Sequence, residues 1–591
     1  TAGERKPIPF VEDTAVPVKN LANYIRDFKK LLDSYDLEYA MYGHVDVGCL
    51  HVRPALNLKK PDEEVWVREL SDQVVGLVKK YGGVMWSEHG RGFRSEYTVD
   101  FFGDELTQDL QHIKEAFDPN NRLNPGKIVT PFSHKDPVLT LEGPLRGHKE
   151  RKIHQDYLKE YQSAIHCNGN AACLDYAYDS VMCPSSKVTR ENIHSPKGRA
   201  SLIREWLRQI SLNQQKTLQE IKSKGVIQNL LIKICNTLCK MKGEYDFSHE
   251  VYKSMSGCLV CKACVTQCPV NVDVPEFRSK FLELYHSRYF HPIKDYLVGS
   301  TESFGRLFSQ IPFLINTFLN LSFCKEIFKN QIGLIDFPLY SPESVRKRLL
   351  NYDQTVFNLD DLYTLSAEES KSSVILLQDA FTSFYESQVV VEFYQLLKKL
   401  GFTVYVAPFH PNGKPLHIKG FLKKFRNVAE RNIKWLTHVG GSGIPIVGLD
   451  PSIVLTYRDE YIKILGKNSI KIKVLLPQEF LMMNRDNCRK HSVKSLQNIE
   501  EYHLLGHCTE KTTAESSLEL WQDVFDLFGL DLMLINSGCC GMAGTYGHET
   551  EHYEESLGIY NLSWRKKIPA DPFYRQKILA TGFSCRSQVM R

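Results

Sequence analysis

Short apolar runs alternate with amphipathic segments throughout the last third of the chain. The run at 403–406 has the length and character of a buried strand. The same pattern occurs again 128 positions further along the chain, where Leu504 corresponds to Leu376. Towards the end of the repeat the offset is 132 positions, so that Ile578 corresponds to Ile446. We therefore predict two similar α/β halves, each consisting of strand, helix, strand and loop.

The middle of the chain has helical periodicity. Residues 198–212 place apolar side chains at helical spacing, and a second such stretch covers 219–242. Cys235 and Cys239 lie four positions apart on the second stretch, where they would share one apolar helix face. We interpret both thiols as core residues and not as ligands.

The stretch 285–339 is the most apolar part of the chain, although Ser, Gln, Asn and Lys interrupt it. These interruptions leave no apolar run of the roughly 18 residues that a membrane-spanning helix requires. We interpret the stretch as a pair of buried helices. The alternative is a membrane-surface patch close to a quinone.

Composition excludes some classes of protein. A chain of 591 residues, 42% hydrophobic and 24% charged, is typical of a soluble protein with several domains. Its net charge of +5 is too small to indicate nucleic-acid binding. Most of the sixteen cysteines fall into ligand-like groups, which indicates a reducing compartment. We expect a cytoplasmic location, with peripheral attachment to the inner membrane as a variant.

One cysteine group has the spacing of a bacterial ferredoxin. Cys258, Cys261, Cys264 and Cys268-Pro269 follow C-x2-C-x2-C-x3-C-P. In that pattern three thiolates bind one iron–sulfur cluster and the fourth binds the neighbouring cluster. A structural zinc site is the alternative, but zinc sites favour two separated pairs of cysteines or mixtures of cysteine and histidine.

A partial second motif lies upstream. Cys167, Asn170, Cys173 and Cys183-Pro184 occupy the four places of the same template, with Asn170 where a thiolate is expected. Crossed ligation assigns Cys183, Cys258, Cys261 and Cys264 to one complete 4Fe–4S cluster and Cys167, Cys173 and Cys268 to an incomplete one. Three forms of the incomplete cluster remain possible. It is a 3Fe–4S cluster, a 4Fe–4S cluster in which one iron has no protein ligand, or a 4Fe–4S cluster with another fourth ligand such as His166. The remaining interpretation is that Cys167 and Cys173 are ordinary buried thiols that bind no iron.

The two predicted α/β halves differ in their cysteines. The second half carries Cys508, Cys539, Cys540 and Cys585, whereas the matching places of the first half carry none. We interpret these four thiols as a metal or cluster site or a redox dithiol. His507 is a spare ligand candidate.

The start of the chain offers a different ligand set. His44 and His51 lie seven apart among glycines, and Glu88 precedes His89. Two imidazoles and a carboxylate bind divalent metals such as zinc with positions left open for substrate. Such a metal lowers the pKa of a bound hydroxyl, and His89 is suited to take its proton. A structural role for these histidines is the alternative.

This region resembles the C-terminal domain of FAD-linked oxidases. The resemblance rests on Gly43-His44 with Leu50-His51, on Glu88-His89-Gly90 and on the segment 117–128. It implies a zinc-like site at His44, His51 and Glu88, a base at His89, and a segment near the flavin that contains Asn124 and Lys127. Cys49 stands where most of that family has Asn before Leu-His.

The last third resembles the cysteine-rich CCG domain of heterodisulfide reductases and of the iron–sulfur subunits of glycerol-3-phosphate dehydrogenase and glycolate oxidase. The resemblance rests on Cys508, Cys539-Cys540-Gly541 and Cys585. The family pattern usually ends in CxxC, but Gln588 replaces the last cysteine here. The order of motifs is similar to that of large fused bacterial dehydrogenases, which implies a flavin-binding domain before Thr1 or on a separate chain.

We therefore expect three domains: an α+β FAD-linked oxidase C-terminal domain (1–135), an α-helical two-cluster ferredoxin-like domain (136–345) and a duplicated α/β CCG-like domain (346–591). The resemblance implies oxidation of a D-2-hydroxy acid, foremost D-2-hydroxyglutarate, with FAD, iron–sulfur clusters and a divalent metal. D-lactate or glycolate oxidation, and a pure electron-transfer subunit, are the alternatives. We expect a homo-oligomer with a quinone or an electron carrier as acceptor.

Overall fold

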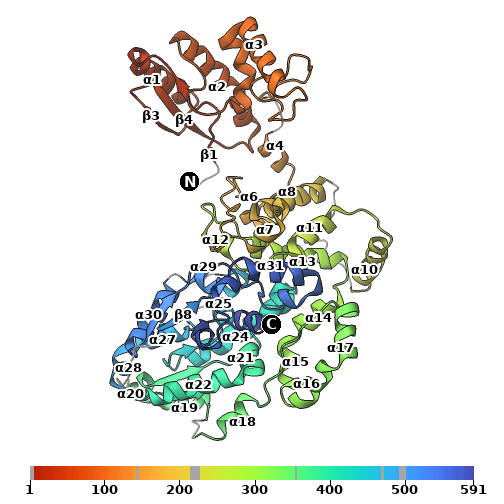
Figure 1. The fold of residues 1–591 in the computed structure, drawn as a ribbon, viewed down its shortest axis with the longest axis vertical. Helices are drawn as coiled ribbons and strands as arrows, with labels where there is room; N and C mark the ends of the chain where they lie inside the picture. Colours follow the sequence, from red (N-terminus) through yellow and green to blue (C-terminus); the bar gives the residue numbers. More distant parts are fainter. Residues whose placement is uncertain are drawn as a thin grey trace. The chain divides into compact units, whose positions relative to one another are not determined.

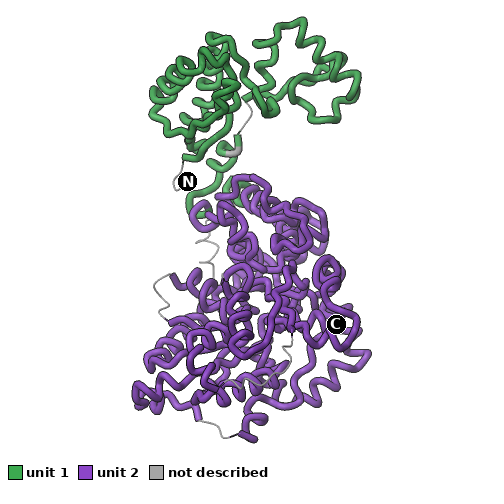
Figure 2. The backbone as a smooth tube through the Cα atoms, turned by 60° about the vertical axis from the view of Figure 1, so that its left-hand side comes forward, with its two compact units in different colours: residues 1–157, 207–215 green, residues 158–206, 216–591 purple. Residues whose placement is uncertain are grey.

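The computed structural model forms two compact units (Figures 1 and 2). One unit contains residues 1–157 and 207–215, and the other contains 158–206 and 216–591. The structure describes residues 5–141, 145–212, 226–352, 356–466, 472–491, 501–514 and 516–591. Among these residues, no helix combines the length and the apolar character that crossing a bilayer requires.

The first unit is built around an antiparallel sheet. Its longest strand, β4 (Cys49–Leu56), pairs with β3 (Tyr39–His44) on one side and with β1 (Lys6–Pro7) and β2 (Thr14–Ala15) on the other. Helices α1 (Val18–Asp33) and α2 (Pro61–Lys80) share one hydrophobic core with the sheet. Along α1 the buried residues recur at helical spacing, which is why this segment folds as a helix on the sheet. They are Leu21, Tyr24, Phe28 and Leu32.

A helical region follows and carries the ferredoxin-like cysteines. The predicted helix at 198–212 is present as α8 (Pro196–Leu212). The second predicted stretch is present from its described start as α10 (Val226–Met241), while 219–225 lies outside the described residues. Cys235 is exposed and Cys239 half-buried, so our assignment of both to the core was wrong. Helical spacing identifies an apolar face, but it does not show what covers that face.

The apolar stretch 285–339 also differs from its prediction. It forms several short helices, among them α15 (Thr301–Phe308), α16 (Pro312–Asn320) and α17 (Ser322–Ile327). No residue of α16 is buried, and Phe313 is 80% exposed. The expected pair of buried helices is therefore wrong. Proline and short polar interruptions break the stretch into helices too short to bury every apolar side chain.

The last third contains two small parallel sheets of identical design. In the first half β5 (Ser373–Leu376) lies between β6 (Thr403–Val406) and β7 (Ile446–Val447). In the second half the strand order is the same, with a central β8 (Glu501–Leu505) between β9 (Asp531–Leu534) and β10 (Ile578–Ala580).

The pairing registers reproduce the repeat found in the sequence. Ser373 pairs with Thr403 and Glu501 with Asp531, so the paired residues are 30 positions apart in both halves. Gly401 and Gly529 precede the second strand of each half, and both have a positive φ. Glycine suits this turn because it adopts a positive φ without steric cost. The predicted duplication is therefore present in the fold.

Candidate functional sites

Two histidines and a glutamate meet at the end of the β3–β4 hairpin in the first unit. Tyr42 pairs with His51 across the hairpin, so His44, two residues after Tyr42, lies on the same face diagonally from His51. The Nε2 atoms of His44 and His51 lie 3.5 and 3.6 Å from the two carboxylate oxygens of Glu88. These three ligand atoms lie within 4.8 Å of one another.

The donor set fits a divalent metal with open positions. Imidazole nitrogen and carboxylate oxygen are the ligand types that zinc and manganese accept. His51 is 3% exposed, whereas the side chains of His44 and Glu88 are 55% and 41% exposed. One side of the site is therefore held in the protein while the other remains accessible to a ligand.

Asp13 holds the segment that carries Glu88 and His89. Its buried carboxylate accepts hydrogen bonds from the backbone N–H groups of Ser87, Glu88 and His89 at 3.0, 2.9 and 3.0 Å. The guanidinium of Arg94 lies 3.6 Å from the same carboxylate. Sequence reasoning missed Asp13. The available signal was a pair of acidic residues, Glu12 and Asp13, directly before strand β2.

His89 lies beside the metal-type cluster. Its ring stacks on that of His51 with centroids 5.1 Å apart, and its Nδ1 lies 3.8 Å from a carboxylate oxygen of Glu12. Cys49, which replaces the family's Asn, places its Sγ 3.7 Å from Nε2 of His51. Burial raises the pKa of the Cys49 thiol, which keeps it uncharged.

A cavity of about 600 Å³ lies next to the Glu88-His89 segment. Gly90, Arg91 and Gly92, which directly follow His89, line it together with Asn124 and Lys127. The Lys127 ammonium lies 4.3 Å from the centroid of the Phe93 ring. The two residues that the resemblance placed near a cofactor therefore share a ligand-sized cavity with the residues that follow His89.

The four cysteines assigned to the complete cluster line one small cavity in the second unit. Cys183 directly precedes α7 (Pro184–Thr189), and Cys258, Cys261 and Cys264 surround the start of α12 (Ala263–Thr266). Burial raises the pKa of Cys261 and of Cys264 well above the ordinary thiol value. Without a bound cation these thiols stay protonated, whereas a metal bound by them would deprotonate them.

These four thiols are not gathered as tightly as the ligands of a single zinc ion. Four thiolates on one tetrahedral zinc lie about 3.8 Å apart, given Zn–S bonds of about 2.3 Å. Among the described residues, none of these four sulfur atoms belongs to a group of three ligand atoms within 4.8 Å of one another. The four cysteines surround a space instead of converging on one point.

The incomplete motif is only partly brought together. Cys173 packs against Met182 and Cys183 in one apolar cluster. Asn170 is exposed, and its side-chain oxygen accepts a hydrogen bond from Ala172 N at 3.0 Å, so it stabilises a turn. Cys268 is buried shortly after α12. Joint ligation by Cys167, Cys173 and Cys268 stays a prediction.

The cysteines of the second α/β half follow the carboxyl ends of its strands. Cys508 starts α29 (Cys508–Thr513) after β8, Cys539 and Cys540 follow β9, and Cys585 lies in α33 (Phe583–Met590) after β10. Parallel strands bring these ends to one edge of the sheet. Cys508 and Cys539 share one buried cluster, and Cys540 and Cys585 share a second.

Lys511 supplies a positive charge to this site. Burial lowers the pKa of its ammonium, while the four cysteines oppose that shift. Its Nζ donates a hydrogen bond to the carbonyl of Gly538 at 3.1 Å and to that of Ser537. His507 is also buried, and burial lowers the pKa of its imidazole to about 4. Sequence reasoning missed Lys511, whose signal was a lysine one helical turn after Cys508.

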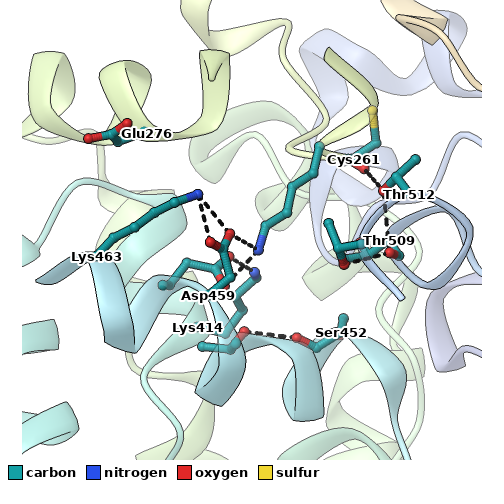
Figure 3. Close-up of polar contacts among 12 residues, drawn as sticks. Cys261, Glu276, Lys414, Ser452, Asp459, Lys463, Thr509 and Thr512 are labelled. Carbon is teal, nitrogen blue, oxygen red and sulfur yellow. Dashed lines mark hydrogen bonds and ion pairs between the residues drawn. The ribbon is translucent and has the colours of Figure 1, made fainter. Parts of the chain in front are cut away.

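The ferredoxin-like loop touches the cysteine site of the second half. Cys261 packs against the cluster that contains Cys508 and Cys539. The Thr512 hydroxyl donates a hydrogen bond of 3.0 Å to the carbonyl of Cys261 (Figure 3). The two predicted redox sites of this unit are therefore neighbours.

The next residue of the loop, Lys262, binds the first half. Its buried Nζ forms ion pairs of 2.6 and 2.8 Å with Asp459 and Glu460. Lys414 pairs with Glu460, and Lys463 pairs with Asp459 at 2.7 Å (Figure 3). Lys262 has a φ of 62°, a left-handed conformation that turns its side chain and the Cys261 carbonyl to different partners.

Comparison with known proteins adds family information. Residues 1–128 match the family described as FAD linked oxidases, C-terminal domain. The whole chain is 46% identical to a D-2-hydroxyglutarate dehydrogenase of Escherichia coli K12 and 45% identical to one of Pseudomonas putida KT2440. It spans 58% of the length of each of these relatives.

A third relative covers another part of the chain. It is one of the subunits of the anaerobic glycerol-3-phosphate dehydrogenase of Escherichia coli K12. The match is 28% identical and includes 32% of this chain and 48% of that protein. No solved structure matches this chain.

Proposed function

We propose that this chain forms part of an FAD-linked dehydrogenase that oxidises a D-2-hydroxy acid, foremost D-2-hydroxyglutarate to 2-oxoglutarate. The observation that carries the proposal is the cluster of His44, His51 and Glu88 with His89 stacked beside it. The match of residues 1–128 and the names of the relatives that match the whole chain support it. The flavin would be bound mainly by a domain or chain other than this one.

The residues of the first unit have separate roles in this proposal. His44, His51 and Glu88 would hold a divalent metal such as zinc, which lowers the pKa of a bound hydroxyl and orients the adjoining carboxylate. His89 takes the hydroxyl proton, as a neutral imidazole does near pH 7. Asp13 keeps Glu88 and His89 in place through their backbone N–H groups. Asn124 and Lys127 orient the substrate or cofactor in the cavity.

The second unit would carry electrons away. Cys183, Cys258, Cys261 and Cys264 would hold a 4Fe–4S cluster, which accepts and releases single electrons. The contact between Cys261 and the Cys508–Cys539 cluster supports transfer onward to the cysteines of the second half. The acceptor beyond them is a quinone or an electron carrier.

Turnover of the full-length protein tests the proposal. D-2-hydroxyglutarate, D-lactate and glycolate are compared, with and without a chelator, and bound metal is measured in parallel. We expect His44→Ala to lower kcat/KM for D-2-hydroxyglutarate about 100-fold or more and to release the metal, because one ligand of three is lost. His154→Ala is the matched control, since His154 is exposed in the same unit and lies outside the cluster.

Each other outcome contradicts a named part of the proposal. Faster turnover of D-lactate or glycolate than of D-2-hydroxyglutarate would show that the proposed substrate is wrong. Reducible clusters without turnover of any D-2-hydroxy acid would identify an electron-transfer subunit. Full activity of His44→Ala would remove the metal site.

A further inference from the structure

A large cavity lies in the second unit, beside the helices α17 and α33. Its volume is about 810 Å³, within the range of roughly 300–1,000 Å³ that is common for small-molecule sites. Three parts of the chain line it: residues 319–339, Tyr385-Glu386 and the segment from Phe583 to Arg591, with His548 between them. We propose that this cavity binds a quinone, which takes the electrons that the proposed dehydrogenase releases.

Helix α33 connects the cavity with the cysteine site. Phe583, Ser587 and Met590 line the cavity and lie on one face of the helix, at spacings of four and three residues. Cys585 is two positions from Phe583 and therefore points to the opposite face, where it packs with Cys540. One helix, about 10 Å across, separates the cavity from the cysteines.

The lining combines aromatic and apolar side chains with charged ones, among them Lys325, Glu326, Lys329, Asp336 and Glu386. Phe328, Phe337 and Phe583 supply aromatic faces. Phe583 is itself held in place, since it stacks on Phe381 with centroids 5.2 Å apart. A planar quinone ring would pack against the aromatic side chains, while the polar side chains of the lining would face its oxygen atoms.

Polar groups at one end offer partners for a quinone carbonyl. The side chain of Arg591 is nine-tenths buried, and its Nη1 has no hydrogen-bond partner in the described structure. A buried donor without a partner costs free energy, which an acceptor on a ligand would recover. His548, whose Nδ1 lies 3.2 Å from the Ile335 carbonyl, lines the same cavity.

The segment at the cavity also presents the exposed apolar side chains of the preceding helices. Phe313, Leu314, Phe318 and Phe323 are between 50% and 80% exposed. An apolar tail that leaves the cavity along 319–339 would therefore pass over apolar side chains. Natural quinones carry such tails, and short-tailed quinones serve as soluble probes.

The reaction balances with the proposed function, on which it rests. Oxidation of a 2-hydroxy acid to the 2-oxo acid releases two electrons and two protons. Two electrons that arrive singly through the clusters, together with two protons from water, convert the quinone to the hydroquinone.

The first test measures re-oxidation of the full chain with its clusters reduced by dithionite. Decylubiquinone and ferricyanide are compared as oxidants by the return of iron–sulfur absorbance. Leu339→Trp fills the cavity from a residue that is 46% exposed, and Leu350→Trp places the same side chain at a residue that is 70% exposed and outside the lining. We expect Leu339→Trp to slow the quinone reaction about tenfold or more and the ferricyanide reaction less than about twofold. Leu350→Trp should change neither rate.

The second test separates this proposal from the proposed function. Equilibrium dialysis of menadione against the chain without clusters needs neither turnover nor a reducible centre. Saturable binding that is weakened by Leu339→Trp and by Ser587→Trp, but not by Leu350→Trp, supports the site even if no hydroxy acid is oxidised. Absence of saturable binding, or equal rates for Leu339→Trp and Leu350→Trp with decylubiquinone, overturns the proposal.

Discussion

The two α/β halves share a fold but present different chemistry at the same place. After its strands, the second half carries four cysteines and Lys511. At the matching loop of the first half, Asn412 N and Gly413 N donate hydrogen bonds of 2.9 and 2.8 Å to the buried carboxylate of Glu302. The comparison shows that sheet order and register can be kept while the loop ends change from thiols to ordinary polar contacts.

The largest expected effect is the loss of the redox centre that we propose for the second half. Cys508→Ser should lower electron transfer to the acceptor by about 100-fold or more, because removal of one thiolate disrupts the ligand set. Electron paramagnetic resonance of the reduced protein measures the missing centre. Ala380→Ser introduces the same side chain at the matching place of the first half, and we expect it to leave all signals intact. A full set of signals in Cys508→Ser would show that the two halves do not differ in function.

The second-largest expected effect is a loss of stability when the ferredoxin-like loop is detached from the first half. Lys262→Met removes one buried partner of Asp459 and Glu460, which then keep only Lys463 and Lys414, and the loss costs up to about 3–5 kcal/mol. Chemical denaturation followed by circular dichroism measures the loss. Lys398→Met is the control, because Lys398 is exposed at the end of a helix of the first half and lies outside this group of ion pairs. Equal stability of the two variants would mean that the loop does not depend on the first half.

Glu302 makes the first half sensitive to pH. Burial raises the pKa of this carboxyl group to about 7, above its ordinary value of 4.5. The folded protein therefore binds the proton more tightly than the unfolded chain does. The resulting stabilisation is complete below about pH 4.5 and is lost as the pH rises through about 7, a change of about 3 kcal/mol.

Glu302→Gln tests this dependence. Because glutamine does not ionise, the variant should not lose stability as the pH rises. The difference between the melting temperature of the variant and that of the wild type should therefore become more positive from pH 5 to pH 8. Differential scanning calorimetry across this range measures the difference. Glu343→Gln is the control, since Glu343 is a partly exposed surface residue that pairs with Lys347. Parallel pH curves for the wild type and Glu302→Gln would contradict the assignment.

The smallest expected effect concerns Lys511. Lys511→Gln removes a positive charge near the four thiols, which should make reduction of their centre harder and lower its potential by some tens of millivolts. Potentiometric titration measures the shift. Lys398→Gln, at the end of a helix in the first half, should leave the potential unchanged. A potential that does not move in Lys511→Gln would show that the lysine only supports the backbone of Ser537 and Gly538.

Much of this fold could be predicted where the sequence repeats. The offset of 128 positions places the predicted strand 403–406, which is β6, onto β9, and it also aligns Leu376 of β5 with Leu504 of β8. Cys258, Cys261 and Cys264 belong to one local motif, whereas Cys183 was grouped with them by the crossed ligation of ferredoxins, and all four line one cavity. The proximity of His44 and His51 could also be predicted, because both residues belong to one hairpin and lie seven positions apart in the sequence.

The remaining features depend on contacts that sequence spacing does not encode. Asp13 reaches the backbone of Glu88 from 75 residues away. The exposed apolar side chains of α16 and the exposed Cys235 were misinterpreted, because periodicity does not reveal whether a face is covered. The difference between a buried and an exposed apolar helix lies in the neighbouring elements.

The left-handed turn at Lys262 has a consequence for the timing of electron transfer. On one side of this turn, the carbonyl of Cys261 is bonded to Thr512 in the second half, and on the other side Lys262 is paired with Asp459 in the first. The gap between the two cysteine sites is therefore fixed when the protein folds. In the electron path that we propose, passage across this gap is a unimolecular event whose rate does not depend on protein concentration. The half without cysteines therefore helps to fix the distance between the two cysteine sites, because it binds Lys262.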